Sequence, residues 1–215
     1  MTRTIIFDLD GTLLDTLADL TAAVNYALHR QGYPPRTPEE VRTYLGNGAG
    51  RLIECAAPLG CKDINIDTAF ADFKAHYMQH CMDQTHPYTG IPDMLQRLRQ
   101  LGYATAIVSN KLQDGVTQLW RRFFADFVEV AIGELPPLRR KPEPDMLLEA
   151  MRRLGATPDT TIYVGDSEVD IATARAAGLP CISVEWGFRS AEALRQAGAT
   201  RIVSSAEELF NAITQ

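Results

Sequence analysis

The sequence contains little cysteine, and the cysteines that are present form no recognisable site. The four residues include no Cys-x-x-Cys pair and no spacing with histidine that is typical of zinc: Cys55, Cys61, Cys81 and Cys181. A disulfide-stapled secreted fold and a small zinc module are therefore excluded as starting hypotheses. We expect buried or free thiols in a reducing compartment.

The sequence also lacks an excess of positive charge. It has 21 Lys and Arg residues against 27 Asp and Glu residues, which gives a formal net charge of -6 and a pI near 5.2. Nonspecific binding to nucleic acid or to anionic membranes depends on Lys and Arg that neutralise phosphates. We therefore expect neither partner, and an anionic substrate would need a local positive charge.

Long apolar runs are absent as well. No stretch reaches the length of a signal peptide or of a membrane-spanning helix, and residues 1–3 lead directly into a short apolar run, so the default expectation is a cytoplasmic protein. With 46% hydrophobic and 22% charged residues in 215, the composition is that of a globular protein with one or two domains. Monomer and homodimer both remain open.

Residues 18–83 carry only helical patterns. Apolar residues recur at helical spacing on two faces, one made of Leu20, Ala23, Val24, Ala27 and Leu28 and the other of Ile66, Phe70, Phe73, Tyr77 and Cys81. Proline pairs near residue 35 and a glycine-rich stretch at 45–50 separate these patterns as loops. The sequence predicts a small all-helical unit over residues 16–86.

Strand and helix patterns alternate in the rest of the chain. Strands are predicted at 4–7, 103–108, 128–132, 161–164 and 181–184, and helices at 92–101, 144–154, 169–177 and 205–213. Such alternation is typical of a parallel sheet that is covered on both faces. We predict an α/β fold, a Rossmann-like doubly wound parallel sheet core formed by residues 1–15 and 87–215, with the all-helical domain inserted after the first strand.

The segment Phe7 to Thr16, FDLDGTLLDT, is the most informative part of the sequence. Asp8 and Asp10 come directly after a buried strand, and period-two alternation would point both carboxylates the same way if the chain stays extended. Two carboxylates that face one cavity repel, so one must stay protonated or a cation must lie between them. A strand followed by a polar turn with incidental acids is the alternative.

Polar residues also follow the other strands. Ser109-Asn110-Lys111 comes after the second strand and Gly165-Asp166-Ser167 after the fourth, while Lys141 lies in a loop fixed by Pro142 and Pro144. Because open α/β sheets bind ligands at the carboxyl ends of their strands, we expect these groups to converge. A solvated basic loop is the alternative for Lys141.

The acids among these residues have the chemistry of a magnesium site. Asp8 and Asp166 offer hard oxygen ligands, and magnesium takes one or two carboxylates, keeps waters and binds substrate phosphate. Asp170 lies four residues beyond Asp166, and in the first turn of the next helix its charge would complement the helix dipole. A bound dication would also relieve the repulsion between the acids.

The motifs together resemble those of the haloacid dehalogenase superfamily of hydrolases, and most closely its phosphoglycolate phosphatase-like members with a helical cap domain. The match spans essentially the whole chain and includes DxDGT from Asp8 to Thr12, SNK at Ser109, KPxP at Lys141 and GDSxxD from Gly165 to Asp170. An acid at position 10 favours phosphate ester hydrolysis over dehalogenation, which has no leaving alkoxide to protonate. Lys62 and Lys74 stand in no context that resembles the Schiff-base lysine of phosphonatases.

The resemblance implies a role for each site residue. Asp8 would be the nucleophile that forms an aspartyl-phosphate and Asp10 the general acid and then base, with Lys141 stabilising charge. Substrate would be held by Thr12, Ser109, Asn110, Lys141 and, in the cap, Gly48. Magnesium would be bound by Asp8, the Asp10 carbonyl and Asp166, with Asp170 in support.

We therefore predict a magnesium-dependent phosphatase of a small phosphorylated metabolite, with phosphoglycolate as the leading substrate by resemblance. Two alternatives are a phosphotransferase or mutase of the phosphoglucomutase type and a non-catalytic phosphate-binding protein. The pair His76 and His80 is expected to be a surface feature of a helix, and Trp186 and Phe188 either pack in the core or line the pocket.

Overall fold

The structure is a computed structural model that describes residues 3–57 and 65–215. The chain forms two compact units, one made of Met1–Asp15 with Pro87–Gln215 and the other of Thr16–His86. Each unit is described by itself below, and the first is called the core unit and the second the cap unit. No helix within the described ranges is long and apolar enough to span a membrane.

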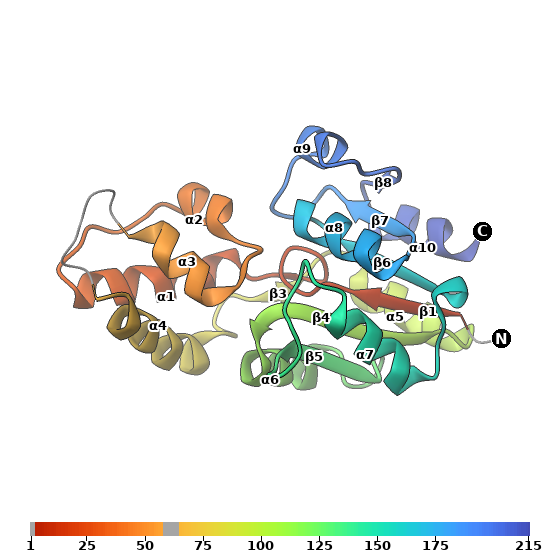
Figure 1. The fold of residues 1–215 in the computed structure, drawn as a ribbon, viewed down its shortest axis with the longest axis horizontal. Coiled ribbons are helices and arrows are strands. Elements are labelled where there is room, and N and C mark those ends of the chain that lie inside the picture. The colour runs from red at the N-terminus through yellow and green to blue at the C-terminus, as the bar shows by residue number, and fades with distance from the viewer. Residues whose placement is uncertain (1–2, 58–64) are drawn as a thin grey trace. The chain divides into compact units, whose positions relative to one another are not determined.

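The core unit is built on a six-stranded parallel sheet with the strand order β5-β4-β1-β6-β7-β8 (Figure 1). Its strands are β1 (Thr4–Phe7), β4 (Ala104–Leu112), β5 (Val130–Glu134), β6 (Thr161–Gly165), β7 (Cys181–Val184) and β8 (Ile202–Val203). The central strand β1 is buried along its whole length. A parallel strand in this position needs apolar residues on both faces, and the sequence TIIF supplies them.

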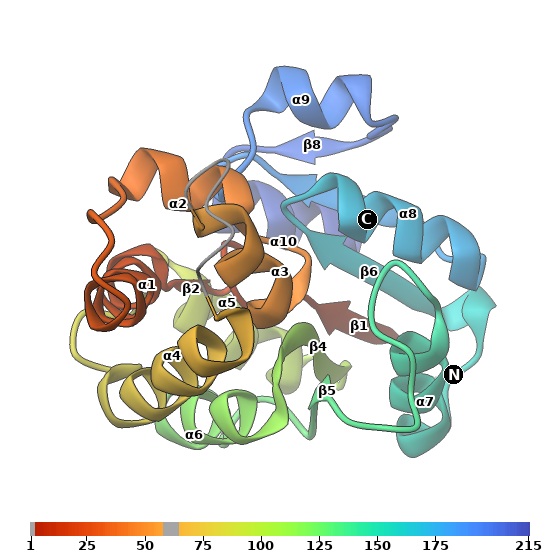
Figure 2. The same ribbon diagram turned by 60° about the vertical axis from the view of Figure 1, so that its left-hand side comes forward.

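Helices cover both faces of the sheet (Figure 2). They are α5 (Ile91–Gln100), α6 (Gln113–Phe123), α7 (Asp145–Leu154), α8 (Glu168–Ala177), α9 (Ala191–Gln196) and α10 (Ala206–Thr214), with a short 3₁₀ turn at Pro158–Thr160. On one face, α7 and α8 pack on a cluster of buried residues that includes Ile6, Val108 and Tyr163. Ile5 and Phe7, which alternate with Ile6, are also fully buried, so the opposite face is covered too.

Between its ends, the described part of the cap unit (residues 16–57 and 65–86) contains four helices and no strand: α1 (Leu17–Arg30), α2 (Pro38–Tyr44), α3 (Gly48–Ala56) and α4 (Ile66–His80). Helices α1 and α4 pack against each other. The face predicted on α1 is buried, as are Phe73, Tyr77 and Cys81 of the second face, whereas Ile66 and Phe70 are partly exposed. Cys61 and Lys62 lie outside the described residues.

The two points at which the insertion leaves and re-enters the core unit lie close together. Strands β2 (Leu14–Asp15) and β3 (His86–Pro87) pair as a two-stranded sheet. Next to it, the backbone N–H of Tyr88 donates to the carbonyl of Leu13 at 3.1 Å. The insertion therefore begins and ends at neighbouring points of the core unit.

The predicted fold class is confirmed: a doubly wound parallel sheet carries an all-helical insertion after its first strand. The elements that were not predicted include α6, α9, the 3₁₀ turn at Pro158–Thr160 and the two-residue strands β2, β3 and β8. The strand predicted over 103–108 also continues to Leu112, with a register shift against β5 between Val108 and Leu112. Ser109, Asn110 and Lys111 therefore belong to β4 itself and do not follow it.

Candidate active site

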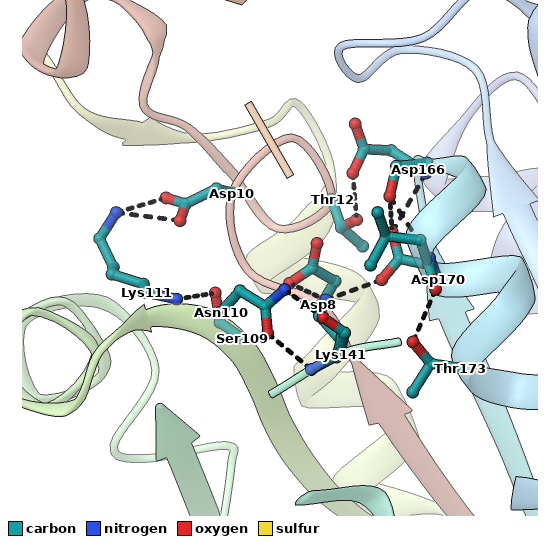
Figure 3. A network of polar contacts seen from close by, with 12 residues as sticks. Asp8, Asp10, Thr12, Ser109, Asn110, Lys111, Lys141, Asp166, Asp170 and Thr173 are labelled. Carbon is teal, nitrogen blue, oxygen red and sulfur yellow. Dashed lines mark hydrogen bonds and ion pairs between the residues drawn. The ribbon is translucent and has the colours of Figure 1, made fainter. Parts of the chain in front are cut away.

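Polar side chains from several segments of the core unit meet at the carboxyl edge of the sheet (Figure 3). Asp8 follows β1, Asp166 follows β6, and Lys141 comes from the loop between β5 and α7. The backbone N–H of Asp8 donates to Val164 at 2.8 Å, which extends the pairing of β1 with β6 up to the first acid. Parallel strands in register thus bring Asp8 and Asp166 to the same level.

Lys141 joins two of the acids. Its ammonium lies 2.9 Å from Asp8 Oδ1 and 2.7 Å from Asp170 Oδ1, and it donates to the hydroxyl of Tyr163 at 3.1 Å. The Tyr163 hydroxyl in turn donates to Asp170 Oδ1 at 2.8 Å. All four side chains are buried, so each ion pair is shielded from water and strong.

Asp170 also forms the start of α8. Its Oδ2 accepts hydrogen bonds from the backbone N–H of Ser167 at 3.1 Å and from the Ser167 hydroxyl at 2.6 Å, and the two residues form a capping box. This explains how a fully buried carboxylate is tolerated, because both oxygens have donors. Asp170 therefore links the helix terminus to Lys141.

Asp166 is held by groups of its own. Its Oδ1 accepts from the Thr12 hydroxyl at 3.3 Å and its Oδ2 from the backbone N–H of Phe188 at 2.7 Å. A Cβ atom on Gly11 or on Gly187 would overlap the Asp166 side chain, so only glycine fits at these two positions. The loops after β1 and β7 thus enclose this carboxylate.

The three acids carry more negative charge than one lysine can balance. Burial, together with the charges of Asp170 and Asp10, raises the pKa of Asp8 to about 7 despite Lys141 beside it. Burial and the charges of Asp170 and Asp8 raise the pKa of Asp166 well above its ordinary value. Burial opposes ionisation of Asp170 too, but Lys141 and the hydrogen bonds from Lys141, Ser167 and Tyr163 lower its pKa overall.

This arrangement fits a small divalent cation. Oxygens of Asp8, Asp166 and Asp170 all lie within 4.8 Å of one another, and all three residues are buried. Hard carboxylate oxygens are the ligands that magnesium prefers. The raised pKa values of Asp8 and Asp166 show that full ionisation of the cluster requires positive charge beyond Lys141, which a dication would supply.

Asp10 has different partners. Its two oxygens accept from the ammonium of Lys111 at 2.8 and 2.9 Å. Strand β1 ends at Phe7, and the carbonyl of Leu9 already accepts turn hydrogen bonds from Thr12, Leu13 and Leu14, so the extended backbone does not continue to Asp10. The acids that lie close around Asp8 are consequently Asp166 and Asp170. The charge of Asp170 raises the pKa of Asp8 more than the charge of Asp10 does.

Comparisons with known proteins identify the family of the chain. A family model described as haloacid dehalogenase-like hydrolase matches residues 5–184, which include every acid and lysine of the site. The chain belongs to this family. The resemblance expected from the sequence motifs is thereby confirmed.

Known relatives of this hydrolase are phosphatases. It is 35% identical over 191 residues to a phosphoglycolate phosphatase of Pseudomonas putida, covering 86% of this chain and 70% of the relative. It is 30% identical over 187 residues to an N-acetylmuramic acid 6-phosphate phosphatase of Pseudomonas aeruginosa, covering 86% and 83%. A solved structure of a proposed phosphoglycolate phosphatase from Lactobacillus delbrueckii subsp. bulgaricus is similar with a TM-score of 0.91 and 38% identity over 99% of both chains. The hydrolase is therefore an enzyme of the phosphatase type.

Asn110 and Ser109, which were predicted to hold substrate, have side chains that form hydrogen bonds within the protein. The side-chain amide of Asn110 accepts from the backbone N–H of Lys141 at 2.8 Å and donates to its carbonyl at 2.9 Å. The hydroxyl of Ser109 accepts from the backbone N–H of Lys111 at 3.2 Å. Asn110 thus holds the Lys141 backbone, and the substrate roles of both residues stay predictions. Gly48 begins α3 in the cap unit, and its substrate role stays a prediction as well.

Several contributors were not identified from the sequence. Tyr163 was assigned only as a strand residue, and Lys111 only as one of several polar groups at a strand end. Trp186 donates from its indole N–H to the carbonyl of Thr12 at 3.1 Å, which ties the loop after β7 to the loop after β1. Phe188 is buried and contributes its backbone N–H to Asp166. Their roles depend on contacts between segments far apart in the chain.

The histidine pair forms no metal group. The rings of His76 and His80 stack at 4.4 Å, and His80 Nδ1 lies 2.8 Å from Asp83 Oδ2. Within residues 3–57 and 65–215, the cluster of Asp8, Asp166 and Asp170 is the only group of three or more potential metal ligands. The pair lies on α4, partly exposed.

Proposed function

We propose that this enzyme is a magnesium-dependent phosphatase that hydrolyses phosphoglycolate or a similarly small phosphorylated metabolite through an aspartyl-phosphate on Asp8. The observation that carries the proposal is the cluster of three buried acids around one lysine, in which Asp8 has a pKa of about 7. Such a carboxylate is ready to ionise near neutral pH when a further cation is present.

In the first step, an Asp8 carboxylate oxygen attacks phosphorus and the bond from phosphorus to the ester oxygen breaks. Asp10 donates a proton to that oxygen, so the oxygen leaves as a neutral hydroxyl group and not as an alkoxide. Lys141, which touches Asp8 at 2.9 Å, offsets the charge of both the nucleophile and the phosphoryl group.

In the second step, Asp10 accepts a proton from water as the water oxygen attacks phosphorus. The bond from phosphorus to Asp8 breaks, which releases inorganic phosphate and restores the Asp8 carboxylate. Magnesium, held by Asp8, Asp166 and the Asp10 carbonyl with Asp170 in support, would supply further charge neutralisation when it is bound. Asp170 meanwhile keeps Lys141 in place.

The names of the relatives guide the choice of substrate. Phosphoglycolate is the first candidate, because relatives at 35% and 34% identity are named phosphoglycolate phosphatases. The relative named for N-acetylmuramic acid 6-phosphate makes phosphorylated sugars the second class to be compared. A mutase or phosphotransferase would transfer the phosphoryl group to a sugar and would not release it to water.

The proposal is tested with Asp8→Asn. We expect release of phosphate from phosphoglycolate in the presence of magnesium, loss of activity in excess chelator, and at least about a thousandfold loss of kcat in the variant, because an amide is a far weaker nucleophile than a carboxylate. Asp159→Asn, which removes the charge of an exposed aspartate of the core unit, is the matched control and should keep full activity.

Circular dichroism and thermal melting must show that the Asp8→Asn protein is folded. Undiminished turnover by Asp8→Asn, or equal wild-type rates with magnesium and with excess chelator, would contradict the proposal. Phosphate that appears on a sugar acceptor in place of water would favour the mutase alternative.

A further inference from the structure

Each acid of the DxD segment has a lysine of its own. Asp8 pairs with Lys141, whereas both oxygens of Asp10 accept from Lys111 (Figure 3). The ammonium of Lys111 thus holds both oxygens of the Asp10 carboxylate. The direction of the Asp10 side chain is therefore set by Lys111.

The position of Lys111 is fixed by the surrounding fold. Lys111 lies inside β4, in the part of the strand where the register against β5 shifts, and its side chain is only 6% exposed. Its aliphatic stem passes beside Gly115 of α6: a Cβ atom on Gly115 would lie 3.5 Å from Cγ and Cδ of Lys111. A buried ammonium is costly unless it is paired, so the ion pair with Asp10 restricts the freedom of the Lys111 head group.

Asp10, in contrast, remains partly open. Its side chain is 19% exposed, while the backbone around it is fixed by a bridge to Leu14 and by the turn at Gly11, whose φ is +86°. Because the backbone is fixed, the position of the carboxylate depends on the side-chain rotamer of Asp10. The ion pair with Lys111 selects that rotamer. A proton donor displaced by about 1 Å loses roughly a hundredfold in rate, so this selection matters for chemistry.

We propose that Lys111 is a positioning residue for proton transfer: it orients the Asp10 carboxylate toward the ester oxygen of the bound substrate. The inference rests on the proposed function, in which Asp10 gives a proton to the leaving alcohol. It assigns to the third residue of the SNK segment a task separate from that of Lys141, which serves the nucleophile.

The dependence on the leaving group tests this role. An alkyl phosphate such as phosphoglycolate needs its ester oxygen protonated, whereas 4-nitrophenyl phosphate and acetyl phosphate release stable anions without a proton. For Lys111→Met we expect kcat/KM to fall about a hundredfold with phosphoglycolate and less than about threefold with 4-nitrophenyl phosphate. The value of kcat/KM reports only steps up to formation of the aspartyl-phosphate, so a slower second step does not disturb the comparison.

The readout is the ratio of the two kcat/KM values, which is unaffected by any loss of folded protein. Lys111→Gln should change the ratio in the same direction, and Lys74→Met, which removes an exposed lysine of the cap unit, should leave it unchanged. Asp10→Asn should show the largest change in the ratio. Adding Lys111→Met to Asp10→Asn should then cause little further change, because the two residues act as one unit.

Two failures are distinguishable. A wild-type protein that hydrolyses neither phosphoglycolate nor the two activated phosphates refutes the proposed function itself. An active wild type with an unchanged ratio in both Lys111→Met and Lys111→Gln leaves the phosphatase proposal standing and overturns the role of Lys111, because a purely structural ion pair would lower both kcat/KM values together.

Discussion

Two buried acids at the carboxyl edge of the sheet have pKa values above those of ordinary carboxyl groups. Asp8 and Asp166 share this property because they lie out of water and next to Asp170, whose own negative charge is retained by Lys141 and its hydrogen bonds. A proton and a metal ion are alternative ways to balance the same charge. The raised pKa values of Asp8 and Asp166 therefore make metal binding depend on pH.

The pH dependence has a definite sign. The pKa of Asp8 is raised from 3.8 to about 7, so the folded chain keeps a proton where the unfolded chain has lost it. The stability that this proton provides in metal-free protein is complete below pH 3.8 and is lost as the pH rises through about 7. Magnesium must displace the same proton, so its affinity should increase over this range.

We expect magnesium affinity to fall roughly tenfold for each pH unit below 7 for every proton displaced. Thermal melting with and without magnesium, at about pH 5.5 and about pH 8, measures this as a larger increase in Tm at the higher pH. Asp159→Asn should behave like the wild type, and sodium chloride at equal ionic strength should produce no such difference. An increase in Tm that is the same at both pH values would refute competition between the proton and the ion.

At the scale of elements, the loop after β1 determines whether the acid cluster can form. Gly11 has a φ of +86°, and a Cβ atom there would overlap both Asp166 and Phe188. Gly102, after α5, has a similar φ of +79° but no heavy atom within 4 Å of such a Cβ. The two glycines share the conformational requirement and differ in the contact with Asp166.

This difference makes a matched pair of variants. Gly11→Ala and Gly102→Ala should each lose about 1 kcal/mol of stability from the strained backbone. Only Gly11→Ala should also raise the magnesium concentration for half-maximal activity, by at least about tenfold, because displaced ligand-supporting groups weaken metal binding to that degree. Phosphatase rates measured across a magnesium titration give this concentration for each variant. An equal increase in both variants would contradict the role of Gly11.

Elements with strong local signals could be predicted from the sequence. Strand β1 and the end of α8 at Gly178 are observed where they were predicted, since a buried apolar run and a helix-terminating glycine are local features. The continuation of β4 through Ser109, Asn110 and Lys111 was not predicted, because three polar residues after an apolar run are typical of a loop. Helix α6 was missed for a similar reason, as it begins with polar residues and contains Gly115.

The acid cluster was predicted in part. Asp8, Asp166 and Lys141 were expected to converge because parallel strands bring their carboxyl ends to one edge. The pairing of Asp10 with Lys111 was not, since it depends on a register shift in β4 and on the turn at Gly11. Such features follow from tertiary packing and leave no local pattern.

At the scale of the whole molecule, the residues of the candidate active site lie outside the inserted helical unit. The acids and lysines of the site all belong to the core unit, which has its own sheet and buried core. The ends of the core unit at the insertion are close together, as the hydrogen bond from Tyr88 to Leu13 shows. We propose that the cap unit, residues 16–86, contributes substrate selection and exclusion of water.

Removing the cap unit tests this division. A protein in which a flexible linker of about four Gly and Ser residues joins Asp15 to Pro87 should fold, because no strand of the six-stranded sheet is lost. It should hydrolyse 4-nitrophenyl phosphate within about tenfold of the wild-type kcat/KM, while kcat/KM for phosphoglycolate falls by at least about a hundredfold, because a small substrate loses its enclosing contacts. Circular dichroism establishes folding and steady-state kinetics with both substrates give the ratio. A folded core unit that keeps the full preference for phosphoglycolate would place substrate selection in the core unit, close to Ser109 and Lys111.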